Sequence, residues 1–549
     1  MSGMADLNTD ILIIGAGPTG LLLANLLGNM GVRTLLVERL DDTEREPRAV
    51  SLDDESMRML QSVGLAEEVA NICVHGYGSL YRGPTGKVFA TVKPFVKEFG
   101  FDKRNAFEQP FFVDILRRAA EQLPSVDLRF GTDLVDFQQT PDEVTANVRS
   151  SSHGDQRVRA KYMVACDGGR SSVRKALDIK MSGSTFEEPW LIIDLPSTLN
   201  RCFHTEVFCD PERSCITLPG PGGIRRYEFK LNKGETIEEA ETEAFARKLL
   251  ASVGPDGDQD LRRVQVYTFH ARMAETWRQD RVFLAGDAAH LTPPFAGQGM
   301  NSGLRDAANL GWKLDEAMRS DDPEPLLSSY ESERKPHAWS MIKLAMRMGQ
   351  VMMPSSKLQG RLIRLGFEAL KLHKPSRDYF AQMKYKPRPR FTDGLIWKDG
   401  RPAKATVVGQ MLPQPMVMTV DHVSCLLDSQ LDDRPFIFVY DERPDKVITF
   451  EDVAKFADRG IGVIGITPEA VNPIRASFPI VRDQSRFLSG EPFVSYLGHA
   501  ILVRRDRYIA ATAPVTQVGD LTEPLKYLTN FHTMSEPQWT EGSGAAKAG

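Results

Sequence analysis

Short apolar runs alternate with glycine-rich turns at the start of the chain. Residues Asp10–Ile14 contain four consecutive aliphatic positions, which are too few for a helix and typical of a strand buried on both faces. The Leu- and Ala-rich segment 21–27 predicts a helix, and the run 33–38 predicts a second strand. The pattern therefore predicts a strand–helix–strand unit within the first forty residues.

Glycines stand at the turn between the first strand and the helix, in the order Gly15, Gly17, Gly20. In such a turn the first glycine permits the tight bend, the second lets the backbone approach a pyrophosphate, and the third lets helix and strand pack closely. Glu38 ends the second strand, where its carboxylate can accept hydrogen bonds from ribose hydroxyls. This unit predicts a dinucleotide site but leaves FAD and NAD both open.

Later segments predict further domains. Residues from about 182 to 269 are rich in β-prone runs separated by turns, which predicts a sheet that could cover the cofactor. Residues 322–379 read as amphipathic helix, with Pro336 and Pro354 as interruptions. The segment Lys384–Arg390 is basic and proline-rich, and we expect a solvated linker. Runs at 436–440, 461–466 and 500–504 predict strands that alternate with helices.

Composition narrows the function classes. The chain has 549 residues, 42% hydrophobic and 26% charged, with a formal net charge of −5, which favours several globular domains and argues against a nucleic-acid partner. Six cysteines without a CxxC pair argue against a metal site or a disulfide framework. No apolar run is long enough for a membrane span, and residues 1–10 do not read as a secretory signal, so we expect a cytoplasmic protein. We expect the tail Thr540–Gly549 to be disordered.

Two acidic motifs at predicted strand ends distinguish the cofactors. Asp167 follows the apolar run 162–165, and Asp287 follows the run 281–285. A carboxylate at such a strand end can bind ribityl hydroxyls, which FAD has and NAD lacks. Beyond Asp287, Gly297 and Gly299 open a long predicted helix whose free N–H groups can stabilise negative charge on a reduced flavin, and Pro293 can press against the flavin ring. These features favour FAD.

Together, the segments Gly15–Gly20, Asp167–Arg174 and Gly286–Asn301 resemble the motifs of the class A FAD-dependent aromatic hydroxylases. Segments such as 47–49, 53–55, 104–107 and 225–229 are similar to the 3-(3-hydroxyphenyl)propanoate hydroxylase branch of that family. The resemblance runs from about residue 8 to 540. It implies an α/β protein with a GR2-type Rossmann-like FAD-binding domain, an interleaved β-sheet substrate domain and a C-terminal thioredoxin-like domain.

The domain boundaries implied are residues 1–80, 105–181 and 270–321 for the FAD-binding domain, and 81–104 and 182–269 for the substrate sheet. A helical segment (322–383), a linker (384–400) and the thioredoxin-like domain (401–540) follow. Without a CxxC pair, that last domain cannot carry out dithiol chemistry, and we expect it to be structural or dimer-forming.

The glycine turn and the family motifs also indicate a set of FAD-binding residues. Relatives contact the cofactor through an arginine and a glutamine at the positions of Arg48 and Gln109. The full set predicted to bind FAD is Gly15, Gly17, Pro18, Gly20, Glu38, Arg39, Arg48, Gln109, Asp167, Asp287, Pro293, Gly297, Gly299, Met300 and Asn301.

The reaction implied is hydroxylation of a phenolic aromatic acid, with NADH or NADPH and O2, through a flavin C4a-hydroperoxide. Such a reaction needs a group that deprotonates or polarises the phenol and a site that excludes water. The catalytic candidates are Arg226, Tyr227, His204 and His290. The alternatives are a hydroxylase of another phenol, such as resorcinol or a hydroxybenzoate, and a flavin oxidoreductase that does not oxygenate.

Overall fold

The strand–helix–strand unit lies at the centre of an eight-stranded sheet in the computed structural model, which describes residues 5–186 and 188–529. Strand β1 (Ala5–Ile14) pairs in parallel with β2 (Thr34–Val37) on one side and with β11 (Gly154–Ala165) on the other. Its apolar end, Ile11–Ile14, is at most 6% exposed, as expected for a strand covered on both faces. β1 starts five residues before the predicted strand, because residues 5–9 also pair with β11.

The rest of this Rossmann-like lobe surrounds β1. The sheet is completed by β8 (Val126–Arg129), β9 (Thr132–Gln139), β10 (Val144–Ser150), β19 (Arg278–Gln279) and β20 (Val282–Leu284). Its helices are α1 (Pro18–Asn29), α2 (Asp54–Ser62), α3 (Ala66–Asn71), α4 (Gln109–Glu121), α5 (Ser172–Ala176) and α8 (Gly299–Ala317). Two small sheets connect it to the next lobe. One consists of β3 (Ser51–Leu52), β7 (Asn105–Ala106) and β4 (Val74–His75), and the other of β12 (Met181–Thr185), β18 (His270–Ala274) and β21 (His290–Leu291).

The second lobe is built on a seven-stranded sheet, here called the roof sheet. Its strand order is β17 (Arg263–Tyr267), β13 (Trp190–Leu195), β16 (Arg225–Lys230), β15 (Cys215–Pro219), β14 (Thr205–Phe208), β5 (Ser79–Arg82) and β6 (Val88–Val92). Apolar residues on one face pack against α7 (Glu243–Val253), which follows the short α6 (Ile237–Ala240). The opposite face turns toward the Rossmann-like lobe.

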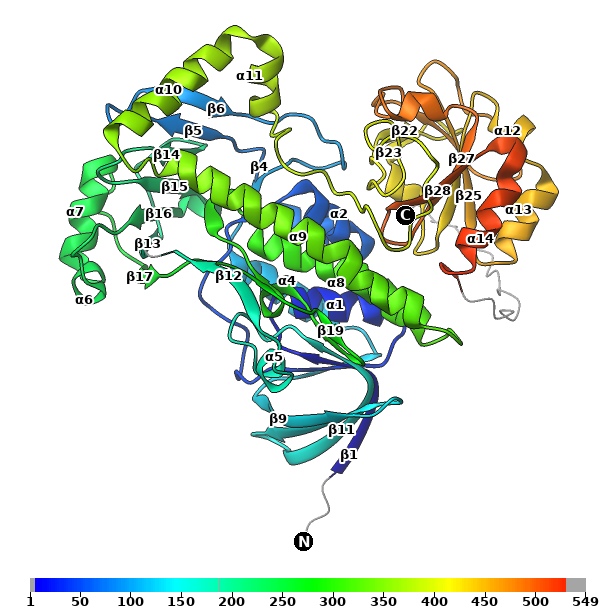
Figure 1. Cartoon of the computed structure of the whole chain (residues 1–549), viewed down its shortest axis with the longest axis horizontal. Coiled ribbons are helices and arrows are strands. Elements are labelled where there is room, and N and C mark those ends of the chain that lie inside the picture. Colours follow the sequence, from blue (N-terminus) through cyan, green and yellow to red (C-terminus); the bar gives the residue numbers. More distant parts are fainter. Residues whose placement is uncertain (1–4, 187, 530–549) are drawn as a thin grey trace, which may run out of the picture.

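Helix α9 (Glu324–Met352) packs against α8 and reaches the edge of the roof sheet, where α10 (Lys357–Leu372) and α11 (Lys374–Ala381) follow (Figure 1). The predicted break at Pro354 lies between α9 and α10. The predicted break at Pro336 is wrong, because Pro336 lies inside the continuous α9. Packing of buried neighbours such as Tyr330, Ala338 and Met341 holds this helix together despite the backbone N–H that proline lacks.

The third lobe is a mixed sheet in the order β23 (Ser424–Leu426), β22 (Met416–Met418), β26 (Ile480–Asp483), β25 (Gly462–Thr467), β24 (Phe436–Tyr440), β27 (His499–Val503), β28 (Ile509–Pro514). Its helices are α12 (Pro444–Val447), α13 (Phe450–Ala457) and α14 (Thr522–Leu525). The parallel β24–β25 pair, joined through helices and flanked by the antiparallel β27–β28 hairpin, has the strand pattern of the expected thioredoxin-like fold. The expected disordered tail, Thr540–Gly549, lies outside the described residues.

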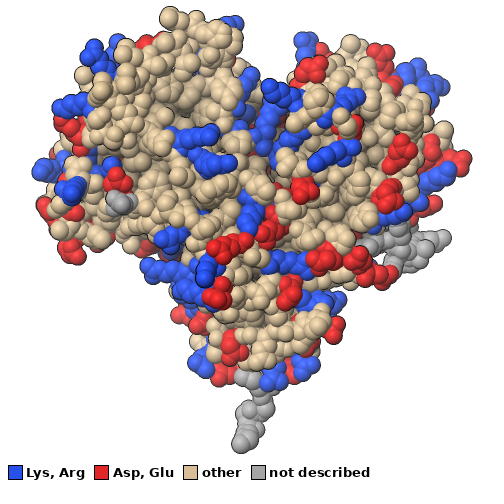
Figure 2. Space-filling view, in the orientation of Figure 1, with Lys and Arg blue, Asp and Glu red and all other residues tan. Residues whose placement is uncertain are grey.

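Acidic and basic side chains are interspersed over the face shown in Figure 2, and neither sign dominates it. Within residues 5–186 and 188–529, none of the helices has both the length and the apolar character needed to cross a membrane.

Candidate active site

A cavity of about 630 Å³ lies between the Rossmann-like lobe and the roof sheet. One half, here called the polar half, is lined by the glycine turn, the end of β2 and the loops before α5 and α8. The other half, here called the apolar half, lies under the roof sheet and the end of α9. Its apolar lining consists of Tyr81, Val207, Ile216, Leu218, Phe295, Leu344, Met348, Met352, Met383 and Tyr385. The two halves form one continuous space.

The glycine turn forms one end of the polar half. Gly15 has φ +106°, a backbone conformation that an L side chain rarely adopts, and its N–H donates to the Val37 carbonyl at 2.8 Å. A Cβ on Gly20 would overlap the Gly15 carbonyl oxygen, whereas a Cβ on Gly17 would meet nothing within 4 Å. Gly17 and Pro18, the first residue of α1, line the cavity, but Gly20 does not. Gly20 thus occupies the helix–strand contact, and Gly17 leaves room beside the helix N-terminus.

Glu38 lies beside this turn. Its Oε2 accepts a hydrogen bond from the Ala16 N–H at 2.8 Å, and its Oε1 accepts one from the Leu40 N–H at 3.0 Å. These bonds fix the carboxylate at the cavity wall while lone pairs remain for hydroxyl groups. The neighbouring Arg39 is exposed and also lines the cavity.

Three polar side chains in the cavity wall have an oxygen without a protein partner among the described residues. Asp287 is reached by solvent through the cavity but is otherwise enclosed by protein, and this burial raises the pKa of its carboxyl group. None of the described residues forms a hydrogen bond with it. Asp167 uses Oδ2 to accept from the Ser172 and Val173 N–H groups at the start of α5, whereas its buried Oδ1 has no partner. The buried Thr292 Oγ1 is also without one. Such groups are costly unless a ligand satisfies them.

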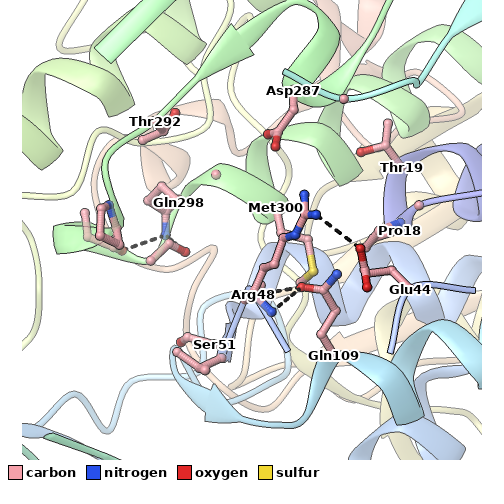
Figure 3. A pocket seen from close by; sticks show the side chains of 18 of the residues that line it. Pro18, Thr19, Glu44, Arg48, Ser51, Gln109, Asp287, Thr292, Gln298 and Met300 are labelled. Carbon is pink, nitrogen blue, oxygen red and sulfur yellow. Dashed lines mark hydrogen bonds and ion pairs between the residues drawn. The ribbon is translucent and has the colours of Figure 1, made fainter. Parts of the chain in front are cut away.

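Arg48, Gln109 and Met300 approach the same space from the side opposite Asp287 (Figure 3). Gln109 Oε1 accepts from the Arg48 and Ala49 N–H groups at 3.2 and 2.7 Å, so its amide nitrogen is left toward the cavity. The Arg48 guanidinium is exposed and pairs with Glu44 at 3.1 Å. Gln109 therefore holds the 48–49 backbone in place at the cavity wall.

Helix α8 begins at the cavity wall. Gly297 has a left-handed backbone (φ +60°), which turns the chain so that Gly299 and Met300 present the first N–H groups of the helix to the cavity. Asn301 does not line the cavity. It accepts from the Asp53 N–H at 3.1 Å and donates to the carbonyls of Ser51 and Gly297, so it clamps the loop to the helix.

Pro293 does not reach the cavity either, which revises its predicted contact with the flavin ring. Its side chain is buried, and the wall is formed by its neighbours Thr292 and Pro294. The backbone is extended at Pro293, so successive side chains point in opposite directions.

The polar half fits FAD by these tests. It has a glycine turn with room for phosphates at the N-terminus of α1, a fixed carboxylate at the end of β2, unpartnered carboxylate oxygens on Asp167 and Asp287, and a second helix N-terminus at Gly299. Twelve of the fifteen predicted FAD-binding residues line the cavity; Gly20, Pro293 and Asn301 support it from behind.

The catalytic candidates Arg226 and Tyr227 lie on the roof sheet but do not line the cavity. Arg226 Nε donates to Asp194 at 2.7 Å, and the same guanidinium holds the carbonyls of Pro47 and Arg48. Tyr227 lies on the opposite face of the sheet, because side chains alternate along a strand, and its hydroxyl donates to Asp256 at 2.7 Å. In this structure Arg226 positions the loop that precedes Ser51 and Tyr227 belongs to the core, so the geometry does not support their catalytic roles, which stay predictions.

The two histidine candidates also lie outside the cavity lining. His204 Nδ1 accepts from the Gly78 N–H at 2.9 Å and so links two segments of the roof lobe. His290 is fully buried, stacks on Trp277 and bonds Asp306 at 2.7 Å between Nε2 and Oδ2. The geometry therefore gives both histidines structural contacts outside the cavity lining, and their catalytic roles stay predictions.

The cavity wall also contains cations that were not predicted, among them Arg104 and Lys386. Arg104 donates to Ser79 Oγ and, at 3.3 Å, to Thr205 Oγ1, and its guanidinium lies 4.2 Å from the centre of the Tyr77 ring. Among the described residues no carboxylate pairs with Arg104. The sequence signal was an arginine beside a buried strand, which is too common to single out.

The second cation is Lys386, which corrects the expectation of a solvated linker. Its Nζ lies 2.9 Å from Asp53 Oδ2 and 2.7 Å from Glu55 Oε1, and Arg305 of α8 pairs with the same two carboxylates. The segment after α11 therefore runs along the cavity wall, where the positive charge of Lys386 pairs with the carboxylates at the N-terminus of α2.

Comparison with known proteins agrees with this architecture. Residues 8–345 match the family described as FAD binding domain, and residues 409–528 match the HcaD C-terminal domain. The chain is 36% identical over 527 residues to a 3-(3-hydroxy-phenyl)propionate/3-hydroxycinnamic acid hydroxylase of Klebsiella pneumoniae, covering 94% of each chain. It is 35% identical over 536 residues to the enzyme of the same name from Escherichia coli K12, covering 96% of each.

A solved structure shares the whole fold. The flavin-dependent monooxygenase PieE, in complex with FAD and substrate, superposes with a TM-score of 0.79 at 22% sequence identity, over 95% of this chain and 99% of the other. The similarity extends through all three lobes, so the third lobe is part of the shared architecture.

Proposed function

The chain belongs to the FAD-dependent aromatic hydroxylases that carry an HcaD-type C-terminal domain, and on that premise we propose that it hydroxylates a 3-(3-hydroxyphenyl)propionate-like phenolic acid. The reductant is NADH or NADPH, and the second substrate is O2. The observation that carries the substrate proposal is the position of Arg104, a cation in the cavity wall that no carboxylate among the described residues pairs with, beside the apolar half.

The polar half would hold the cofactor. Glu38 would accept hydrogen bonds from the adenosine ribose, the N-terminus of α1 would face the pyrophosphate, and Asp287 would accept from ribityl hydroxyls. Bound FAD would supply the redox chemistry, accepting hydride equivalents and activating O2. The N–H groups of Gly299 and Met300 would stabilise negative charge at the end of α8.

The apolar half would hold the aromatic ring. Its methionines and aromatic side chains form a surface that a phenyl ring can pack against and that leaves little room for water. Exclusion of water matters here because an activated oxygen species that meets water is lost as H2O2. A phenol ring is therefore suited to this wall.

Arg104 would bind the carboxylate of the acid side chain. Ser79 and Thr205 already orient its guanidinium, so part of the ordering cost is met before the ligand arrives. A guanidinium offers a carboxylate two parallel hydrogen bonds. This favours a phenolic acid over resorcinol, which has no charged group for Arg104 to bind.

The test is to purify the protein, record its visible spectrum, and follow NADH and NADPH oxidation with and without 3-(3-hydroxyphenyl)propionate. The proposal expects bound flavin, oxidation stimulated by the acid, and a dihydroxylated product. Resorcinol and 3-hydroxybenzoate serve as comparison substrates. Bound flavin with no hydroxylated product from any phenol would favour an oxidoreductase that does not oxygenate, and would overturn the proposal.

A further inference from the structure

Glu228 is a buried carboxylate that faces the apolar half of the cavity. It is 6% exposed and lines the cavity near the middle of the roof sheet. None of the described residues donates a hydrogen bond to its side chain. A carboxylate in this position, away from bulk water, is costly unless something that enters the cavity interacts with it.

The pairing of the roof sheet explains why Glu228 points this way. Glu228 on β16 pairs with Ile216 on β15, Ile216 pairs with Val207 on β14, and Val207 pairs with Tyr81 on β5. All four line the cavity and form one row across the sheet. The neighbours of Glu228 along the strand, Tyr227 and Phe229, are in the core on the other face. Glu228 is thus the acidic member of an otherwise uncharged row.

The charged groups around Glu228 leave it free to exchange a proton. Arg226 on its own strand and Arg263 on β17 both pair with Asp194 on β13, at 2.7 and 2.6 Å. Asp194 opposes the effect of these cations, and burial is the largest influence, so the pKa of Glu228 is raised to about 7. A general base works best with a pKa near the operating pH.

The same sheet places Arg104 at a distance from Glu228 that the proposed substrate can span. Arg104 is held by Thr205 and Ser79, on β14 and β5. Glu228 on β16 lies two strand spacings across the sheet and two residues along the strand from Thr205, or about 12 Å between backbone positions. A benzene ring with a short acid side chain can bridge a guanidinium and a carboxylate across such a gap. The carboxylate of the ligand would lie at Arg104 and its hydroxyl at Glu228.

We propose that Glu228 is the general base that takes the phenol proton of the substrate. This rests on the proposed function. The phenol O–H bond breaks, the proton moves to a Glu228 carboxylate oxygen, and the electron pair left on the phenolate oxygen is delocalised into the ring, which becomes the better nucleophile. No oxidant or reductant takes part in this step.

The first test compares Glu228→Gln with Glu188→Gln, an exposed glutamate that pairs with Lys230 of the same strand. Glu228→Gln should keep its bound flavin but lose product formation about 10²–10⁴-fold, the usual contribution of a general base. Glu188→Gln should match the wild type. Product formation by Glu228→Gln within threefold of the wild type would overturn the proposal.

A ring-fluorinated substrate separates a base from a residue that only shapes the pocket. Fluorine makes the phenol more acidic, so less help with deprotonation is needed. The loss in Glu228→Gln should therefore shrink at least tenfold with the fluorinated acid. An equal loss with both substrates would overturn the role as a base.

Binding provides a readout without turnover. For the oxidised holoenzyme, the Kd values of 3-(3-hydroxyphenyl)propionate and of 3-phenylpropionate, which lacks the hydroxyl, are measured between pH 5.5 and 9. The preference for the hydroxylated acid should rise by about fivefold or more through pH 7, since an ionised carboxylate is the stronger acceptor. It should not change with pH in Glu228→Gln.

The outcomes are distinguishable. A flat preference in the wild type would overturn the inference but leave the proposed function standing. If the wild type neither binds nor hydroxylates any phenolic acid, the proposed function itself fails.

Discussion

Glu333 of α9 and Arg504 of the third lobe form a fully buried ion pair, with Oε1 and Nη1 2.7 Å apart. Glu333 Oε2 also lies 2.7 Å from Lys313 Nζ of α8, so one carboxylate forms ion pairs with two cations from two lobes. The third lobe is therefore joined to the catalytic lobes through charges that would be costly to separate.

Replacing Glu333 should destabilise the protein strongly. Glu333→Gln leaves the buried Lys313 without a carboxylate partner and Arg504 with Asp506 alone, and breaking a buried pair in this way costs about 3–5 kcal/mol. The measurement is the midpoint of urea unfolding at pH 7. Glu324→Gln, at the exposed start of the same helix, is the control and should shift the midpoint little. Equal midpoints for both variants would contradict the prediction.

The same pair predicts sensitivity to acid. Burial alone would raise the pKa of Glu333, but Arg504 and Lys313 lower it to about 2. A pKa lower in the folded than in the unfolded state gives stability that is present above about pH 4.5 and is lost as the pH falls toward 2. The wild type should therefore lose more stability than Glu333→Gln between pH 5 and 3.

Two glycines only three residues apart should respond differently to alanine. Gly17→Ala should fold normally but lose FAD, because the added Cβ meets no protein atom and projects into the space expected for the phosphates. Gly20→Ala should lower the melting temperature of the protein itself, since its Cβ would overlap the Gly15 carbonyl. Flavin content and the melting temperature without flavin measure the two effects. Full flavin content in Gly17→Ala would contradict the assignment.

Asp287→Ala should bind FAD at least about tenfold more weakly, because the ribityl hydroxyls would lose a charged acceptor worth roughly 1.5–3 kcal/mol. Flavin fluorescence during titration with FAD measures the Kd. Asp321→Ala, at an exposed position after α8, is the matched control. An Asp287→Ala protein that holds FAD as tightly as the control would remove Asp287 from the cofactor site.

Arg104→Gln should raise the Kd for 3-(3-hydroxyphenyl)propionate by about 10–100-fold, which corresponds to the loss of a charge-assisted pair. 3-Ethylphenol has the same ring and no carboxylate, so its Kd should change little in the variant. A similar loss for both ligands would show that Arg104 supports the pocket without binding the carboxylate.

Glu228→Gln should become more stable than the wild type as the pH rises. The pKa of Glu228 is raised in the folded state to about 7, so its stabilising contribution is complete below about pH 4.5 and is lost as the pH rises through 7. The gain of the variant at pH 8.5 should be at most about 3 kcal/mol. Melting temperatures of the substrate-free proteins at pH 5 and 8.5 test this, and a variant that is less stable at pH 8.5 would contradict it.

Local spacing explains what the sequence alone could predict. Gly15, Gly17 and Glu38 are tied to one strand–helix–strand unit, and the backbone bonds to Val37 and Ala16 form within that unit. Asp287 stands three residues after the end of β20, so its place beyond a strand end follows from the neighbouring apolar run. Features that depend on a few consecutive residues were therefore accessible.

The catalytic candidates were harder to predict because they depend on pairing between distant strands. Arg226, Tyr227 and Glu228 are adjacent in sequence, but only the register of β16 with β15 decides which of them faces the cavity. The position of Arg104 depends on its hydrogen bonds to Ser79 and Thr205, which come together only where β5 and β14 pair. Alternation along the strand would have separated Tyr227 from Glu228, but it could not say which face was covered.

Lys386 shows that the oxygenase cannot be reduced to its first two lobes by cutting the chain after α11. A fragment that ended there would leave Asp53 and Glu55 with Arg305 alone, and an uncompensated negative charge would stand beside the cavity. The smallest autonomous catalytic unit must therefore extend past this lysine, and engineered truncations or domain exchanges should place their junction downstream of it.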